Sequence, residues 1–488
     1  MNKDEIYELT IEDMTTDGEG IGHTDGGMAV FVKDALVGDR VRVKIIKVKK
    51  HYAYGRLMEI LEASSYRVTP ICGNARRCGG CAIMHMDYEK QKDYKWNKVR
   101  SCLERIGGCL DIAQKMEPVY GMMYPYAYRN KMQFPVGLDK DGQVKIGFYA
   151  GRTHCIIDMD ECAIGHPVNN YLVKNLRVWL QERVEKNPRY IYDEQTHKGL
   201  VRHILTRVGF ATGELMICVV INGESLSLDK KNETILNQSF VEVLEKSVRQ
   251  YNESANPGDL QVTLKSVSVN VNREKTNRIL GERCKTIWGE DTITDYIGDV
   301  AFRISPLSFY QVNPVQTKVL YDKALEYAAL SGQETVWDMY CGIGTISLSL
   351  AKAAKKVYGV EIVPQAIVDA KENAKINHLS NVAFYCGKAE TVVPEFMEGK
   401  LGDAEGRTPD VVVVDPPRKG CDEQLLSTIL HMQPKRIVYV SCDPATLARD
   451  VKILCETEYQ VEKVAVVDQF CHSTHVETIC LLSRKVPV

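Results

Sequence analysis

Two motifs in the last third of the chain combine a carboxylate and a cysteine. Residues 415–420 (DPPRKG) follow four valines, and Cys442 follows the apolar run RIVYVS. Both motifs therefore lie at the carboxyl ends of predicted strands, where open α/β sheets bind ligands. A cysteine at a strand-to-helix turn, before a helix amino terminus, can have a lowered pKa and act as a nucleophile. The two motifs predict covalent catalysis in one crevice.

A third motif near the end, residues 468–478 (DQFCHSTHVET), contains Glu477. A carboxylate in a crevice can act as a general base. A single glutamate is more often a surface residue, so a catalytic role for Glu477 depends on the family resemblance given below.

A glycine-containing loop predicts a cofactor site. Residues 338–345 (DMYCGIGT) directly follow the predicted strand TVWDM. Glycines after a strand let the backbone approach a ligand closely at the head of a helix. The loop lacks the GxGxxG of dinucleotide sites, and Asp-x-x-x-Gly-x-Gly suits the amino-acid part of S-adenosylmethionine (SAM). Glu361 ends the next predicted strand, where an acidic residue accepts hydrogen bonds from ribose hydroxyls.

Three of the 16 cysteines, Cys72, Cys78 and Cys81, are closely spaced, with Gly79 and Gly80 between the last two. Three such thiolates suit an iron–sulfur cluster or zinc. A fourth ligand is needed, and the nearest candidates are Cys155 and Cys162. The spacing alone does not choose between the two kinds of metal site.

Three regions must position these residues. Residues 1–63 alternate apolar and polar residues in short stretches with glycine-rich turns, Gly20 and Gly22 among them, which predicts a small OB-like β-barrel. Residues 64–300 read as a mixed α+β central domain, in which 226–259 resembles a peripheral insertion. Residues 301–488 alternate helix and strand, which predicts an α/β, Rossmann-like, doubly wound sheet.

Local positive charge is expected in two places, although 62 Lys+Arg against 64 Asp+Glu give a net charge of −2. Residues 41–50 (VRVKIIKVKK) carry a basic stripe, which is either a solvated strand face or a phosphate contact. A helix over 87–106 carries basic residues, including Lys95 and Lys98, and should turn Trp96, Val99, Leu103 and Ile106 to the core. The net charge therefore excludes only a uniformly basic binder.

The remaining bulk features favour a soluble cytoplasmic protein. The composition, 26% charged and 44% hydrophobic, excludes wholesale disorder. No apolar run approaches the roughly 18–20 residues of a membrane helix. The polar start, MNKDEIYELT, is unlike a signal peptide.

Together these motifs resemble the SAM-dependent RNA uracil-C5 methyltransferases, in particular the 23S ribosomal RNA enzymes with a TRAM domain and a [4Fe–4S] cluster. The resemblance rests on GEGIG, YRNKMQFPV, SPLSFYQVNPVQ, DMYCGIGTISL, DPPRKG and SCDPATLARD. It implies a class I methyltransferase domain in which Cys442 is the nucleophile and Glu477 the base. It also implies SAM binding by Gln311, Tyr340, Thr345, Glu361 and Asp415, and a cluster held by Cys72, Cys78, Cys81 and Cys162, away from the chemistry.

The resemblance further implies a monomer acting on an unpaired or flipped uridine. A transfer RNA uracil-C5 methyltransferase and a non-catalytic RNA-binding protein are the alternatives. A cytosine-C5 DNA methyltransferase typically presents a Pro-Cys pair, whereas Ser441 precedes Cys442 here. One departure from the family pattern is Cys471, which occupies the place of a proline in the late motif.

Overall fold

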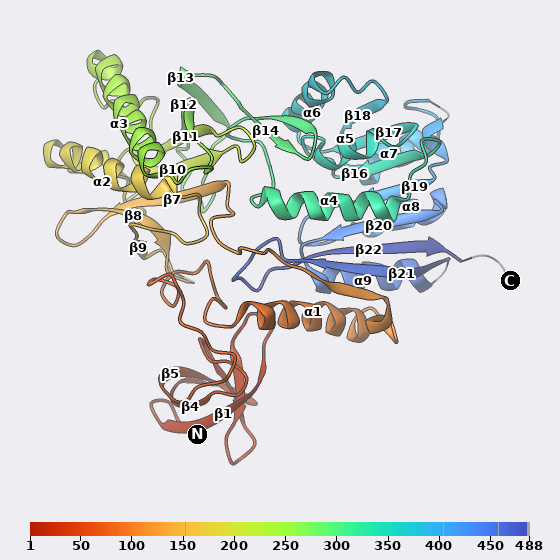
Figure 1. Ribbon diagram of the computed structural model, residues 1–488, viewed down its shortest axis with the longest axis horizontal. Coiled ribbons are helices and arrows are strands. Elements are labelled where there is room, and N and C mark those ends of the chain that lie inside the picture. The colour runs from red at the N-terminus through yellow and green to blue at the C-terminus, as the bar shows by residue number, and fades with distance from the viewer. Residues whose placement is uncertain (152, 404, 457, 486–488) are drawn as a thin grey trace.

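The computed structural model describes residues 1–151, 153–403, 405–456 and 458–485. Figure 1 shows a small barrel at the amino terminus, a central sheet with two helices, and a larger carboxyl-terminal sheet with helices on both faces. Helix α1 (Tyr88–Arg105) lies between the barrel and the carboxyl-terminal sheet. Among the described residues, no helix combines the length and the apolar character needed to cross a membrane.

The barrel is closed, as the sequence predicts. Its order is β1-β2-β3-β5-β4, with β1 (Ile6–Met14), β2 (Gly20–His23), β3 (Ala29–Val32), β4 (Arg40–Val48) and β5 (Tyr52–Glu62). Gly20 and Gly22, predicted to form turns, lie instead in β2. A Cβ on Gly20 would come within 2.8 Å of the Ala35 carbonyl oxygen, and one on Gly22 within 2.7 Å of that of Thr10. These glycines therefore permit close approach inside a strand.

The basic stripe on β4 is largely neutralised by acids of neighbouring strands. Arg40 pairs with Glu62 at 2.8 Å, Arg42 with Glu8 at 2.9 Å, and Lys44 with Asp4 at 2.9 Å. Because these cations already have partners, the first half of the stripe fits a solvated face better than a phosphate contact.

Helix α1 begins after Asp87, whose carboxylate accepts a hydrogen bond from the Glu89 amide at 3.0 Å. Val99 and Leu103 are fully buried, as predicted. Ile106 is 43% exposed, and the prediction was wrong there because the helix ends one residue earlier. Lys95, expected on a basic surface, is fully buried and pairs with Asp468.

The central region forms a seven-stranded sheet of order β13-β12-β11-β10-β7-β8-β9. Helix α3 (Glu233–Ser254) was predicted to be peripheral, but it buries Phe240, Leu244 and Val248 in the core of this sheet. The other elements are α2 (Val168–Lys186), β7 (Lys131–Leu138), β8 (Val144–Tyr149), β9 (Ile156–Asp158), β10 (Val201–Val208), β11 (Glu214–Ile221), β12 (Thr263–Val271), β13 (Arg283–Gly289), and the hairpin β14 (Ile293–Ile297) and β15 (Val300–Ile304).

The carboxyl-terminal sheet confirms the doubly wound prediction. Its order is β18-β17-β16-β19-β20-β22-β21-β6, with β16 (Thr335–Met339), β17 (Lys356–Glu361), β18 (Val382–Cys386), β19 (Val411–Val414), β20 (Arg436–Ser441), β21 (Tyr459–Val467) and β22 (Glu477–Arg484). One face is covered by α4 (Pro314–Ala328), α5 (Thr345–Ala351) and α6 (Pro364–Ile376). The other is covered by α7 (Ala389–Met397), α8 (Glu423–Met432), α9 (Pro444–Glu456) and α1.

The last strand of this sheet comes from far upstream. β6 (Met116–Tyr120) pairs in parallel with β21 at the sheet edge. Val99, Leu103 and Met116 join the core on this side of the sheet. Residues 88–120, assigned to the central domain from the sequence, are therefore part of the carboxyl-terminal layer in space.

Candidate active site

One cavity of about 670 Å³ opens at the carboxyl ends of β16, β17, β19 and β20. This is the place where a doubly wound sheet binds its ligands. The structure brings all the predicted cofactor and catalytic residues to this cavity: Gln311, Tyr340, Thr345, Glu361, Asp415, Cys442 and Glu477.

The loop after β16 is shaped as a cradle. Tyr340 and Gly344 have positive φ angles of 68° and 86°, and Gly344 begins α5 as its amino-terminal cap. Among the described residues, no atom lies within 4 Å of a Cβ placed on Gly342. Glu361 accepts hydrogen bonds from the amides of Gly342 at 3.2 Å and Val363 at 2.8 Å, which fixes its carboxylate beside the loop.

Two carboxylates beside the cradle have raised pKa values. Burial raises the pKa of Asp338 to about 7, and burial also raises the pKa of Asp415 to about 7. Ser347 donates to one oxygen of Asp338, and the other oxygen has no partner among the described residues. A positive charge placed here would stabilise both ionised groups. The donor set therefore fits SAM, whose sulfonium is a cation.

Strand register sets Cys442 against Glu477. β20 and β22 are antiparallel, and their last pair at this end is Ser441 with Thr478. Cys442 follows Ser441 and Glu477 precedes Thr478, so the next positions along both strands face each other. Asp443 then caps α9 by accepting hydrogen bonds from the Ala445 and Thr446 amides, at 2.9 and 3.2 Å.

The resting thiol differs from the sequence prediction. Burial, followed by the charges of Glu477 and Asp415, raises the pKa of Cys442 to about 11. Burial and the two carboxylates therefore oppose the lowering that a helix amino terminus would give. Burial and the charge of Asp415 also raise the pKa of Glu477 well above its usual value. A carboxylate with a raised pKa is a stronger base when ionised.

The motif after Cys442 holds the loop after β19. The Thr446 hydroxyl donates to the Arg418 carbonyl at 3.2 Å, and the Arg449 guanidinium donates to the Lys419 carbonyl at 3.0 Å. The Cys421 amide donates to Asp450 at 2.8 Å. Sequence reasoning quoted these α9 residues only as part of a motif. Their role is to fix the loop that carries Asp415 and Arg418.

The four predicted metal ligands share a second cavity, of about 460 Å³. It is lined by Cys72, Cys78, Cys81 and Cys162, while Cys155 is exposed and lies outside the lining. Burial and the charges of the neighbouring thiols raise the pKa of Cys81 and of Cys162. Within the described part of the chain, no group of three or more His, Cys, Asp or Glu is arranged to hold a metal ion.

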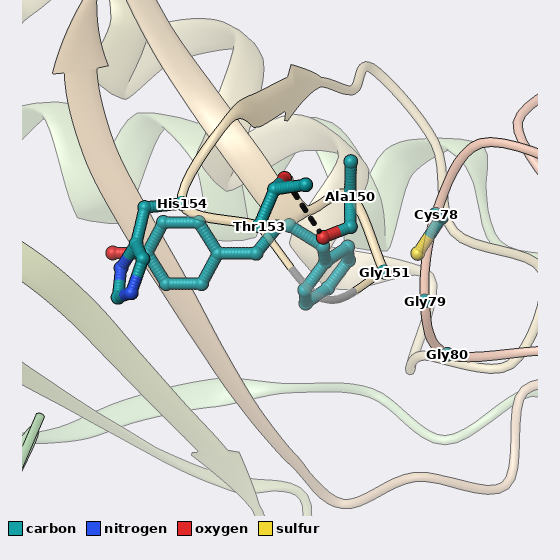
Figure 2. A pocket seen from close by; sticks show the side chains of 9 residues that line it. Cys78, Gly79, Gly80, Ala150, Gly151, Thr153 and His154 are labelled. Carbon is teal, nitrogen blue, oxygen red and sulfur yellow. Dashed lines mark hydrogen bonds between the residues drawn. The ribbon is translucent and has the colours of Figure 1, made fainter. Parts of the chain in front are cut away.

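The CGGC segment has a structural reason for its glycines. Figure 2 shows Cys78 with its sulfur turned toward the loop that carries Ala150 and Gly151. Residues of both segments line a hollow of about 520 Å³. Cys78 and Ala150 form an antiparallel bridge. A Cβ on Gly79 would come within 3.2 Å of the Gly151 Cα, so glycine at position 79 permits the close approach of the two loops.

Comparisons with known proteins agree with this geometry. A tRNA (uracil-5-)-methyltransferase family model matches residues 249–485, and a TRAM domain model matches residues 3–58. An uncharacterized RNA methyltransferase of Halalkalibacterium halodurans is 46% identical over 99% of this chain and 98% of its own length. One from Clostridium tetani is 47% identical, covering 99% and 97%.

The chain belongs to the tRNA (uracil-5-)-methyltransferase family. A solved member is similar over the whole length: the Pyrococcus abyssi tRNA (uracil-54, C5)-methyltransferase in complex with S-adenosyl-L-homocysteine has a TM-score of 0.72 at 26% identity. The match covers 98% of this chain and 100% of that one. The predicted resemblance and fold are therefore confirmed, including the TRAM barrel and the methyltransferase sheet.

In this family member the cysteine cavity adjoins the catalytic cavity. Arg418, Phe470 and His475 line both. The 468–476 segment, which leads into Glu477, therefore contributes to a wall that the two cavities share.

The raised pKa of Cys442 predicts a steep pH dependence of its reactivity. Because only the thiolate is alkylated, iodoacetamide labelling of Cys442 should rise about tenfold per pH unit from pH 7 to 10. Glu477→Gln removes a negative neighbour, so it should speed this labelling at pH 8. Mass spectrometry of the labelled peptide gives both rates.

Cys455 is the matched control because burial also raises its pKa to about 11, and it lies outside the cavity lining. The labelling rate of Cys455 should rise with pH in the same way, and Glu477→Gln should leave that rate unchanged. If the labelling rate of Cys442 reached a plateau below pH 8, the raised pKa of this thiol would be wrong.

Proposed function

We propose that the chain transfers the methyl group of SAM to C5 of a uridine in 23S ribosomal RNA, giving 5-methyluridine. The observation that carries this proposal is the placement of Cys442 opposite Glu477 in the cavity of the glycine loop. A nucleophile and a base on one side of a SAM-type cradle suit alkylation of a carbon that is a poor nucleophile.

The chemistry proceeds by addition and elimination. The Cys442 thiolate adds to uracil C6, and the C5–C6 π electrons form an enolate with nucleophilic character at C5. SAM, when bound, would supply the methyl group that C5 takes, with cleavage of the sulfonium S–CH₃ bond and S-adenosylhomocysteine as the leaving group. Glu477 then accepts the C5 proton, and the electron pair released reforms the C5–C6 double bond and expels Cys442 as thiolate. Cys442 leaves as the thiolate that began the cycle, and Glu477 releases the C5 proton to solvent before the next turnover.

Two further residues would recognise the substrate. Asp415 is half-buried at the cavity, and its pKa of about 7 lets it donate a hydrogen bond to the base when protonated. Arg418 is exposed at the cavity and can contact the RNA backbone. Because the cavity sits among strand ends, the target base must be unpaired or flipped out of its helix.

The choice of 23S RNA rests on the combination of the barrel with four cysteines. A transfer RNA substrate is the second candidate, since the P. abyssi tRNA (uracil-54, C5)-methyltransferase matches the barrel and central regions as well. Mapping 5-methyluridine in 23S and transfer RNA from a deletion strain tests the proposal. Loss confined to 23S RNA is expected, and loss confined to transfer RNA would reverse the choice.

We further propose that Cys72, Cys78, Cys81 and Cys162 hold a [4Fe–4S] cluster. A zinc ion draws its sulfur ligands to within about 4 Å of one another, given Zn–S bonds of roughly 2.3 Å. A four-iron cluster sits between its cysteines and needs a wider cage. The shared cavity, of about 460 Å³, supports a group of that size between the four thiols.

Anaerobic purification should therefore give a brown protein with about four iron and four sulfide per chain. Cys162→Ser should lose the colour, whereas Cys155→Ser should keep it because Cys155 lies outside the cavity. A colourless protein with one zinc per chain would overturn the cluster.

A further inference from the structure

Segment 468–476, called here the catalytic loop, joins β21 to β22 and delivers Glu477 to the cavity. Its side chains Phe470 and His475 also line that cavity. Glu477 is 3% exposed, so its position depends on how this loop is held. The residues that hold it are therefore candidates for control of the proton-removal step.

One face of α1 holds the catalytic loop. Tyr88, Gln91, Lys95 and Lys98 are spaced by three, four and three residues, which places them on the same side of a helix. This is the side that sequence reasoning assigned in part to a basic surface. In the structure Gln91 and Lys95 are 1% and 0% exposed.

Alternate residues of the loop are bound in turn. At its start, Tyr88 donates to the Asp468 carboxylate at 2.7 Å, and Lys95 pairs with the same carboxylate. Lys95 also donates to the Phe470 carbonyl at 2.9 Å. A carboxylate and an ammonium buried together are held in one geometry, because losing either partner leaves an uncompensated charge.

Further along the loop the contacts continue. Gln91 accepts from the His472 amide at 3.1 Å and donates to its ring Nδ1 at 3.2 Å. His472 has a positive φ of 65°, a backbone state that its contacts must maintain. Lys98 donates to the Thr474 carbonyl at 2.9 Å and to the Thr16 carbonyl of the barrel at 3.0 Å.

We infer that Gln91, Lys95 and Lys98 are positioning residues that set the catalytic loop, and through it Glu477, for removal of the C5 proton. The contacts reach positions 470, 472 and 474, the last only three residues before Glu477. The inference rests on the proposed function, because it assigns these residues to one step of that reaction.

The test uses Gln91→Met and Lys98→Met in the full-length protein. Each removes hydrogen bonds without leaving a buried carboxylate unpaired, whereas Lys95→Met alone would strand Asp468 and can fail to fold. Turnover of uridine RNA should fall on the order of 10- to 100-fold, with KM for SAM within about twofold of wild type. KM for SAM should change little because the SAM cradle is formed by the loop after β16 and not by α1. Lys98→Arg keeps a donor and should restore most of the loss.

An RNA that contains 5-fluorouridine separates removal of the C5 proton from the earlier steps of the reaction. With 5-fluorouridine RNA no C5 proton is present, so the reaction stops at the methylated Cys442 adduct and does not need Glu477. Gln91→Met and Lys98→Met should form this adduct at close to the wild-type rate. Melting temperatures near wild type exclude general unfolding.

The matched control is Arg100→Met, a cation of the same helix that faces Glu104 at 3.9 Å and the Trp96 ring. It should leave turnover unchanged. If Lys98→Met raises KM for RNA with kcat intact, α1 is an RNA contact and the inference is wrong. It is equally wrong if adduct formation slows as much as turnover. Failure of the proposed function looks different, since the wild type would then form neither adduct nor product.

Discussion

Cys442→Ala is expected to lower kcat for RNA methylation by on the order of 10⁴-fold or more, while SAM binding stays within about twofold of wild type. Without addition of sulfur at C6, uracil C5 lacks the electron density to take a methyl group. The cofactor cradle is built by the loop after β16 and by Glu361, so it does not depend on the thiol. Transfer of labelled methyl groups to RNA and equilibrium dialysis with SAM measure the two quantities.

Cys455→Ala is the matched control for this substitution. Cys455 lies on α9, which begins just after Cys442, and has a similarly raised pKa, but it does not line the cavity. Its replacement should leave turnover close to wild type. If Cys442→Ala methylated RNA at a near wild-type rate, the covalent mechanism would be wrong.

Glu477→Gln is expected to trap the enzyme on its substrate. Attack by Cys442 and methyl transfer remain possible, but the C5 proton has no acceptor, and the sulfur cannot leave until that proton does. A methylated RNA–protein adduct should accumulate and survive denaturing electrophoresis. Steady-state turnover should drop by about 10²- to 10⁴-fold, the range of a lost general base.

The double variant Cys442→Ala with Glu477→Gln provides the control, because it should form no adduct. Release of free 5-methyluridine RNA by Glu477→Gln at a normal rate would remove Glu477 from the reaction. An absence of adduct in Glu477→Gln would place its role before the sulfur attack.

Much of the site was predictable because its residues occupy short motifs at strand ends. Asp415 and Cys442 each directly follow an apolar strand, and parallel strands end at one edge. Glu361 was found by its spacing from the glycine loop. These inferences need only local periodicity and the topology of a doubly wound sheet, and the structure brings the residues into one cavity.

Other features depend on contacts between distant segments, which a single sequence does not show. The local sequence predicts Lys95 to be a surface cation. Its buried partner Asp468 is 373 residues away in the chain, so the pair is visible only in the structure. A single sequence does not show that burial and the carboxylates of Glu477 and Asp415 raise the pKa of the Cys442 thiol. Cys471, the departure from the family pattern, proves to be fully buried beside the Tyr88 hydroxyl, with 3.6 Å between sulfur and oxygen.

Strand β6 is synthesised long before β21, the strand with which it pairs, so the carboxyl-terminal sheet is completed by a segment from the first third of the chain. The edge of β21 is covered by residues made early in translation, and α1 covers apolar surface on one face of the same sheet. A fragment that starts at residue 301 would leave both exposed, and an open apolar strand edge invites aggregation. Any chimera that exchanges catalytic halves between members of this family must therefore carry residues 88–120 along with the half that they complete.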